Sequence, residues 1–182
     1  MSRKDKPLST DEIFARRASA VALRRGYAQL LLRLIFIVAA VYAVLTYGFA
    51  VLQVSGNEMF PSVKDGDLVI AYRLQKDYYQ NDTVVYSVEG KKAVGRIVAC
   101  EGDVVQITES GVLIVNGTTQ SGEIYFATYP RDEGGTELRV PENCVYILGD
   151  YRTNSTDSRD FGAVSADDLI GKVITVLRRR GI

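Results

Sequence analysis

The sequence predicts a mainly β protein of short antiparallel strands, preceded by one N-terminal transmembrane helix. Two observations support this fold class. Residues 34–52 read LIFIVAAVYAVLTYGFAVL and contain no charged side chain. From residue 67 onward, the chain breaks into short segments rich in Val, Ile and Tyr, which are separated by turn residues. Hydrophobic residues make up 47% of the chain and charged residues 24%, as is typical of a folded protein.

Residues 1–33 are predicted to be a basic tail on the cytoplasmic side of a membrane. They carry eight Lys or Arg residues and three acids, so the tail has a charge of +5 in a chain whose net charge is zero. The remainder of the chain is therefore acidic. Positive residues that flank a membrane span stay on the cytoplasmic side. Within residues 1–30 the pattern also favours a loosely amphipathic helix, with Thr10 as its N-cap.

Residues 34–52 are predicted to be an uncleaved signal anchor, because about 20 apolar residues cross the ~30 Å hydrocarbon core. A buried core helix is one alternative, but such helices are seldom apolar on all faces over this length. A cleavable signal peptide is another. Its apolar region is normally about 7–15 residues long and ends in a small-x-small site. The exit GFAVLQVSGNE has no good site of that kind, so residues 53–182 are expected to form an extracytoplasmic β domain that stays attached.

The β domain is predicted to contain eight short strands. Turn sequences such as KDGD, EGKK, EGD and NGT bound them, which is typical of an all-β sandwich or barrel. ITESGVLIVNGTT indicates a hairpin followed by an Asn-Gly turn. An exposed loop is expected at 128–137 and one short helical turn at 165–169. The expected strands are 67–74, 83–88, 93–100, 103–108, 111–117, 137–141, 144–150 and 171–177.

Several kinds of chemistry are excluded by composition. The chain has no histidine, which removes Ser/His/Asp and Cys/His catalytic systems and His-ligated metal sites. Two cysteines, Cys100 and Cys144, are too few for a metal cluster. They form one disulfide or are two small buried residues, and both alternatives stay open. We expect no metal and no cofactor. Nucleic acid is not an expected partner, because the body is acidic and has no basic patch interleaved with aromatic residues.

Three motifs follow the apolar run in a specific order. They are SGNEMFPSVKDGDLV at 55–69, AVGRIVACEGDVV at 93–105 and VYILGDYRTNSTDSRDFGAV at 145–164. This order resembles the type I signal peptidases, membrane-anchored serine endopeptidases that remove signal peptides from secreted proteins. The resemblance covers nearly all of residues 34–177. It implies a signal-peptidase-like β fold, in which the tail of the substrate lies extended along a strand edge close to the bilayer.

Signal peptidases of this type use a Ser/Lys dyad. The serine precedes the Met of the first motif, and the lysine precedes the Arg of the second. Serine is a weak nucleophile until a base takes its proton, and a lysine serves as that base when burial depresses its pKa. The matching positions in this sequence are Glu58 and Gly95. The resemblance therefore implies a protein that is not an enzyme.

The neighbouring residues are poor substitutes for the dyad. Ser55 and Ser62 lie roughly 10 Å from position 58 in an extended chain. Lys92 falls on the strand face opposite Gly95, and Lys91 lies roughly 13 Å back along the strand. A displacement of about 1 Å already reduces catalysis strongly, so we expect none of these side chains to take over.

Glu58 and Gly95 each have two interpretations. Glu58 is either a solvated replacement tolerated once the lysine was lost, or a group that now recognises a basic side chain on a bound peptide. Gly95 is either a relaxed position or a means of opening room in the cleft. New chemistry by Glu58 paired with Asp157 is not expected, although paired carboxylates do such work elsewhere.

The former substrate groove is expected to bind a partner by strand addition, with 55–61 and 93–98 as its edge segments. The resemblance gives a structural role to residues of the third motif, in which Tyr151 stands where the family usually has Asn. The expected groove residues are Ser55, Gly56, Asn57, Glu58, Met59, Pro61, Gly95 and Arg96. The expected scaffold residues are Asp150, Arg152, Ser155, Asp157 and Arg159.

A chain with both dyad positions replaced is similar to catalytically degenerate signal-peptidase relatives of Gram-positive bacteria. Those proteins are accessory factors in sortase-dependent pilus assembly. The resemblance thus implies a membrane-anchored, chaperone-like factor that holds a pilin subunit or a class C sortase near the bilayer. The alternatives are an active type I signal peptidase with atypical residues and a subunit that modulates one.

Overall fold

The computed structural model describes residues 10–120, 126–131 and 136–178. The chain forms two compact units, Met1–Leu45 and Thr46–Ile182. The tip of the loop expected at 128–137, with Gly134 and Gly135, lies outside the described residues, as do residues 1–9 and most of the basic C-terminal tail.

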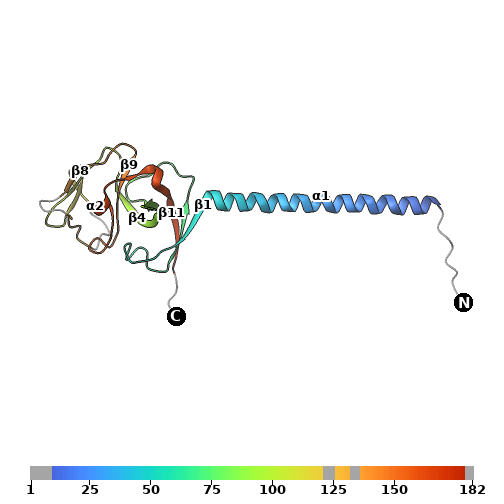
Figure 1. Cartoon of the computed structure of the whole chain (residues 1–182), viewed down its shortest axis with the longest axis horizontal. Helices are drawn as coiled ribbons and strands as arrows, with labels where there is room; N and C mark the ends of the chain where they lie inside the picture. The colour runs from blue at the N-terminus through green and yellow to red at the C-terminus, as the bar shows by residue number, and fades with distance from the viewer. Residues whose placement is uncertain (1–9, 121–125, 132–135, 179–182) are drawn as a thin grey trace. The chain divides into compact units, whose positions relative to one another are not determined.

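The N-terminal unit belongs to one continuous helix, α1, which runs from Thr10 to Gly48 (Figure 1). Its segment Arg24–Gly48 is 25 residues long and apolar enough to cross a membrane. At 1.5 Å per residue this segment is roughly 37 Å long, which exceeds the hydrocarbon core. Large apolar side chains of this segment, such as Leu32 and Phe36, are exposed. The helix is therefore consistent with a single-pass membrane anchor.

The helix ends earlier than the apolar run does. Residues 49–52, which the sequence placed at the end of the membrane anchor, begin strand β1 (Phe49–Gln53) instead. Each residue of β1 pairs with a residue of β2 (Leu68–Tyr72), from Phe49 opposite Tyr72 to Gln53 opposite Leu68. The end of the predicted helix is wrong because apolarity alone does not distinguish a helix from a buried strand.

The β domain contains two antiparallel sheets, and this confirms the mainly antiparallel β fold (Figure 1). The larger sheet has the order β1-β2-β11-β3-β4-β9-β10, and the smaller has the order β7-β6-β5-β8. Beyond β1 and β2, the larger sheet contains β3 (Thr83–Val88), β4 (Lys91–Ala99), β9 (Cys144–Leu148), β10 (Val164–Ser165) and β11 (Leu169–Leu177). The smaller contains β5 (Val104–Ile107), β6 (Leu113–Val115), β7 (Thr118–Thr119) and β8 (Thr136–Arg139).

The eight strands expected from the sequence are all present, and each boundary agrees within two residues. The expected hairpin is β5-β6, and the expected Asn-Gly turn follows it. The short helical turn is the 3₁₀-helix η1 (Ala166–Asp168). Besides β1, the sequence analysis missed the two-residue strands β7 and β10 and the four-residue helix α2 (Ser158–Phe161). Elements this short carry no periodic hydrophobic pattern.

Strand β4 changes neighbours halfway along its length. Residues 91–96 pair with β3, whereas Arg96, Ile97 and Ala99 also pair with β9 on the other side. Within the described part of the chain, Lys91–Gly95 therefore has a partner strand on one side only. A free strand edge of five residues results. It ends at Gly95, because the expected edge at 93–98 is paired with β9 from Arg96 onward.

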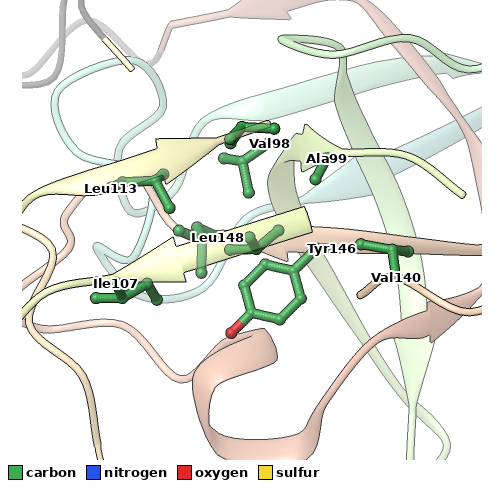
Figure 2. Packing of buried hydrophobic residues seen from close by; sticks show 9 residues of the cluster. Val98, Ala99, Ile107, Leu113, Val140, Tyr146 and Leu148 are labelled. Atoms are coloured by element: carbon green, nitrogen blue, oxygen red, sulfur yellow. The ribbon is translucent and has the colours of Figure 1, made fainter. Parts of the chain in front are cut away.

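Three apolar clusters hold the domain together. One packs the smaller sheet against the ends of β4 and β9, where Val98, Ala99, Tyr146 and Leu148 meet Ile107 and Leu113 (Figure 2). The two other clusters consist mainly of side chains from the larger sheet. Met59 belongs to one of these and is 2% exposed, so the first motif is attached to the core by the residue that follows Glu58.

Candidate functional site

Glu58 is held by the loop of the third motif. The backbone N–H of Tyr151 donates to the Glu58 carbonyl at 2.8 Å, and the N–H of Thr156 donates to Glu58 Oε1 at 3.5 Å. The side chain is half-buried. Burial raises the pKa of Glu58 above its ordinary value, and the negative charges of Asp157 and Asp160 add to this effect.

Gly149 lets the two motifs approach each other. A Cβ atom there would lie 2.7 Å from the Glu58 carbonyl oxygen and 2.5 Å from the Ser155 Cβ. Real Cβ atoms essentially never make contacts below 3.0 Å. The glycine before Asp150 is thus required by the close approach of the chain that carries Glu58.

The loop at 147–159 is fixed by a buried network centred on Asp157. Arg159 donates through Nε to Asp157 Oδ1 and through Nη2 to Oδ2, both at 2.8 Å, and each of these side chains is 1% exposed. Ser155 Oγ donates to the same carboxylate at 2.7 Å, and the N–H of Gly149 donates to it at 3.2 Å. Asp157 also caps helix α2, because it accepts the N–H of Arg159. A two-point ion pair with buried charges of this kind is rigid.

Arg152 is the largest fully buried side chain of the loop. It donates through Nε to the Gly149 carbonyl and through Nη1 to Thr128 Oγ1, both at 2.8 Å. Burial lowers the pKa of Arg152 to about 10, so the guanidinium stays charged at neutral pH. Its role is structural, since it joins the loop to the segment that precedes β8.

Arg96 does not line the groove. Its guanidinium forms a two-point ion pair with Asp150, with both N–O distances 2.7 Å, and also donates to the Asn81 carbonyl at 3.0 Å. Ser62 Oγ donates to the same Asp150 carboxylate. This cluster of Arg96, Asp150 and Ser62 connects β4 to the first and third motifs. Arg96 is therefore an anchor beside the site rather than a wall of it.

Gly95 lies against other side chains and opens no room. A Cβ built on it would collide with Ile147 Cγ2 and would lie 3.0 Å from Tyr86 Cε1. Tyr86 is buried, and burial together with the charges of Glu58 and Asp157 raises its pKa well above the ordinary value. The space next to Gly95, where a lysine side chain would begin, is thus occupied by Ile147 and Tyr86. The interpretation that Gly95 enlarges the cleft does not match this packing.

Two pockets meet at Glu58. The small pocket contains about 450 Å³ of open space and is lined by 52–56, Glu58, Met59 and 92–94. The large pocket contains about 980 Å³ and is lined by Glu58, Tyr86, 88–89, 91–93, Thr156 and 160–161. Glu58, Lys92 and Ala93 belong to both. We call the combined cavity the groove; the free edge of β4 forms one wall, and the chain that continues from β1 forms the other.

The structure brings four of the expected groove residues into the lining: Ser55, Gly56, Glu58 and Met59. Asn57 instead accepts the Asp65 N–H through its side chain. Pro61, Gly95 and Arg96 line neither pocket. Ala93, which belongs to the expected edge segment 93–98, does line the groove. Lys92, Tyr86 and Thr156 also line it, and the sequence analysis did not place these three there.

Two serine hydroxyls near the groove are bonded to aspartates that are themselves paired with arginines. Ser155 Oγ donates to Asp157, which forms an ion pair with Arg159. Ser62 Oγ donates to Asp150, which forms an ion pair with Arg96. Both serines therefore belong to structural polar clusters.

No group of three or more potential metal ligands occurs among the described residues. Cys100 and Cys144 are both free thiols. Cys100 packs with the cluster that contains Ile147, and Cys144 packs with the cluster that contains Tyr146. The structure therefore has no disulfide between them, and both cysteines are partly buried rather than fully buried.

These features define a class: a mainly antiparallel β protein with an apolar N-terminal helix and a groove between a strand edge and a connecting segment. Comparison with known families is more specific. Residues 27–177 match the family model described as signal peptidase, peptidase S26. The chain therefore belongs to the signal peptidase S26 family.

Individual relatives agree with this assignment. The chain is 30% identical over 156 residues to signal peptidase I of Bacillus caldolyticus, and the match covers 76% of this chain and 85% of the relative. It is 31% identical over 138 residues to signal peptidase I of Bacillus amyloliquefaciens, covering 68% and 74% of the two chains. A crystal structure of a signal peptidase I from Enterococcus faecalis V583 superposes with a TM-score of 0.45 at 23% identity, covering 54% of this chain and 97% of the other.

Proposed function

We propose that this chain is a member of the signal peptidase family without peptidase activity, which uses its groove to hold an extended segment of another protein. The observation that carries the proposal is the state of the two dyad positions. Glu58 replaces the nucleophile, and the space beside Gly95 is filled by Ile147 and Tyr86. Loss of a nucleophile and its base removes rate enhancement of order 10⁶.

The groove supports the binding half of the proposal. Its β4 wall presents a free edge at Lys91–Gly95, and an extended segment adds to such an edge through main-chain hydrogen bonds. The two pockets on either side of Glu58 accept side chains of that segment. Binding of this kind requires neither a nucleophile nor a base.

We place the protein in sortase-dependent pilus assembly, as a membrane-anchored accessory factor whose partner is a pilin subunit or a class C sortase. This part of the proposal rests on the resemblance to degenerate relatives that have this role. In this scheme the basic N-terminal tail is cytoplasmic, and α1 crosses the cell membrane once, because Lys and Arg residues flank its N-terminal side. The β domain is then extracytoplasmic.

The test replaces Ala93, which lies between the two pockets, with Trp in the full chain. We expect Ala93→Trp to abolish pilin polymers in cells that carry it as their sole copy, because the indole fills the groove. Thr119→Trp is the matched control, since Thr119 is exposed on β7 in the other sheet. It should leave polymers unchanged. Normal polymers with Ala93→Trp at normal protein levels would contradict a role for the groove.

The alternative of an active signal peptidase has its own readout. The purified full chain is incubated in detergent with a signal-peptide-bearing pre-protein. We expect no cleavage. If the wild-type chain cleaves and Glu58→Ala does not, the inactive interpretation fails. Co-purification with an active signal peptidase would instead favour a modulating subunit.

A further inference from the structure

Glu58 is one of three residues that line both pockets of the groove, and the other two are Lys92 and Ala93. In an extended segment, alternate side chains point the same way and lie roughly 7 Å apart. A segment that fills both pockets with two such side chains therefore passes directly over the Glu58 carboxylate.

The Glu58 carboxylate has little compensation for its partial burial. Its one side-chain hydrogen bond among the described residues is the 3.5 Å contact with the Thr156 N–H, which is long for such a bond. None of the four ion pairs within the described ranges includes Glu58. A half-buried carboxylate in this state is stabilised by a cation that enters the groove.

Two of the acids near Glu58 are already paired with arginines, whereas Glu89, which is exposed and also lines the large pocket, is in none of the ion pairs within the described ranges. Asp157 is paired with Arg159 at 2.8 Å, and Asp160 is paired with Arg131 at 2.9 Å. The lysines of the groove are exposed: Lys91 and Lys92 both stand on the β4 wall, and neither forms an ion pair with Glu58 in the described structure. Their positive charges repel a second cation, so the attraction that a bound Lys or Arg experiences comes from the acids of the groove and not from the β4 wall.

Both pockets have apolar walls, against which the methylene groups of a Lys or Arg side chain can pack. Val88 and Phe161 line the large pocket, and Leu52, Val54 and Val94 line the small one. Lys and Arg bury their methylene stems against apolar walls while the charged head finds a polar partner. The small pocket, at less than half the open space of the large one, suits a small aliphatic side chain.

We propose that Glu58 is a specificity residue: the groove selects an extended segment that carries a Lys or Arg side chain in the large pocket and a small aliphatic side chain two residues away in the small pocket. The inference rests on the proposed binding function and adds the chemistry of the ligand. A signal peptidase would have no use for it, because an acid at this position takes the place of the nucleophile.

The test measures binding of nonapeptides to the full-length chain in detergent by fluorescence anisotropy. The peptides are built from Ala, Val, Thr and Ser, with one Lys placed at each position in turn; in matched peptides the Lys is norleucine or Glu. We expect wild type to bind the best Lys peptide about fivefold to tenfold more tightly than its norleucine match. With Glu58→Gln this ratio should fall to about one, and with Glu58→Lys the Glu peptide should become the preferred one.

The control is Glu109→Gln, which removes an exposed acid distant from either pocket lining and should leave the Lys preference as in wild type. Thermal unfolding of each variant confirms that it is folded. If peptides bind but wild type shows no preference for Lys, or Glu58→Gln keeps the preference, the specificity inference is overturned while the groove function stands. If no peptide binds wild type, both the groove function and this inference fail.

Discussion

The segment at residues 147–159 and the groove wall at residues 91–95 belong to the same site. The polar groups of the first are bonded to one another, whereas the backbone of the second has one unpaired edge. In the loop, Asp157 accepts from Arg159, Ser155 and Gly149 with almost no exposure to solvent. On the groove wall, β4 has a partner strand on one side only among the described residues. The comparison teaches that one part of the site uses its polar groups to hold itself together, while the other leaves backbone groups of β4 open to a partner.

The largest effect should come from breaking the Asp157 network. Asp157→Ala leaves Arg159 charged and buried without its partner, so we expect the β domain to lose about 3–5 kcal/mol of stability. Denaturant unfolding of the full chain in detergent, followed by tyrosine near-UV signals, measures the loss. As a control, Lys172→Met removes the partly exposed ion pair with Asp82 and should cost about 1 kcal/mol or less. Equal losses of stability in Asp157→Ala and Lys172→Met would mean that the Asp157 network contributes no more to stability than a partly exposed ion pair does.

A smaller effect should appear on the groove side, at Gly95. Gly95→Ala adds a methyl group against Ile147 and Tyr86, and we expect it to destabilise the domain by about 1–3 kcal/mol. Ile147→Ala removes the colliding Cγ2 at its own cost. The double variant should therefore be more stable than the sum of the single losses implies, by about 1 kcal/mol. Strict additivity would show that Ile147 does not fill the space beside Gly95.

This packing also bears on attempts to restore activity. Glu58→Ser with Gly95→Lys alone should stay inactive in the pre-protein cleavage assay, because the lysine stem would enter the space that Ile147 and Tyr86 occupy.

The smallest effect concerns the charge of Glu58. Its pKa is raised in the folded protein, so the folded chain holds the proton more tightly than the unfolded chain does. The stability that this group contributes is complete below its ordinary pKa of 4.5 and is lost as the pH rises through the raised value. Glu58→Gln, which removes the charge, should therefore raise the melting temperature slightly at pH 7, by the equivalent of less than about 1 kcal/mol.

The advantage of Glu58→Gln should vanish as the pH falls below 4.5. The titratable groups that share this region are Tyr86, Asp157, Asp160, Glu89, Lys91 and Lys92. Melting curves of both proteins from pH 4 to 8 give the comparison. A larger advantage at low pH than at pH 7 would contradict the assigned direction.

The fold was predictable because its strands are bounded by local turn signals, such as the Gly-Asp and Asn-Gly sequences around β5 and β6. Strand β1 was not predictable, because Phe49–Gln53 continues the apolar composition of the helix. The assignment of Glu58 and Gly95 to the dyad positions rests on the flanking motif residues and stays a prediction. The side chains that fill the space beside Gly95 were not predictable. One of them, Ile147, comes from β9, which is about 50 positions away along the chain.

Because β4 changes neighbours along its length, only part of its edge is free to pair with another strand. A strand that adds to this edge has the five residues Lys91–Gly95 available, and at Arg96 strand β9 already occupies the edge. At roughly 3.4 Å per residue, the edge is about 17 Å long. In the proposed binding mode, the free edge therefore limits how many residues of a partner can pair with β4, and the partner chain must leave the edge where β9 begins to pair.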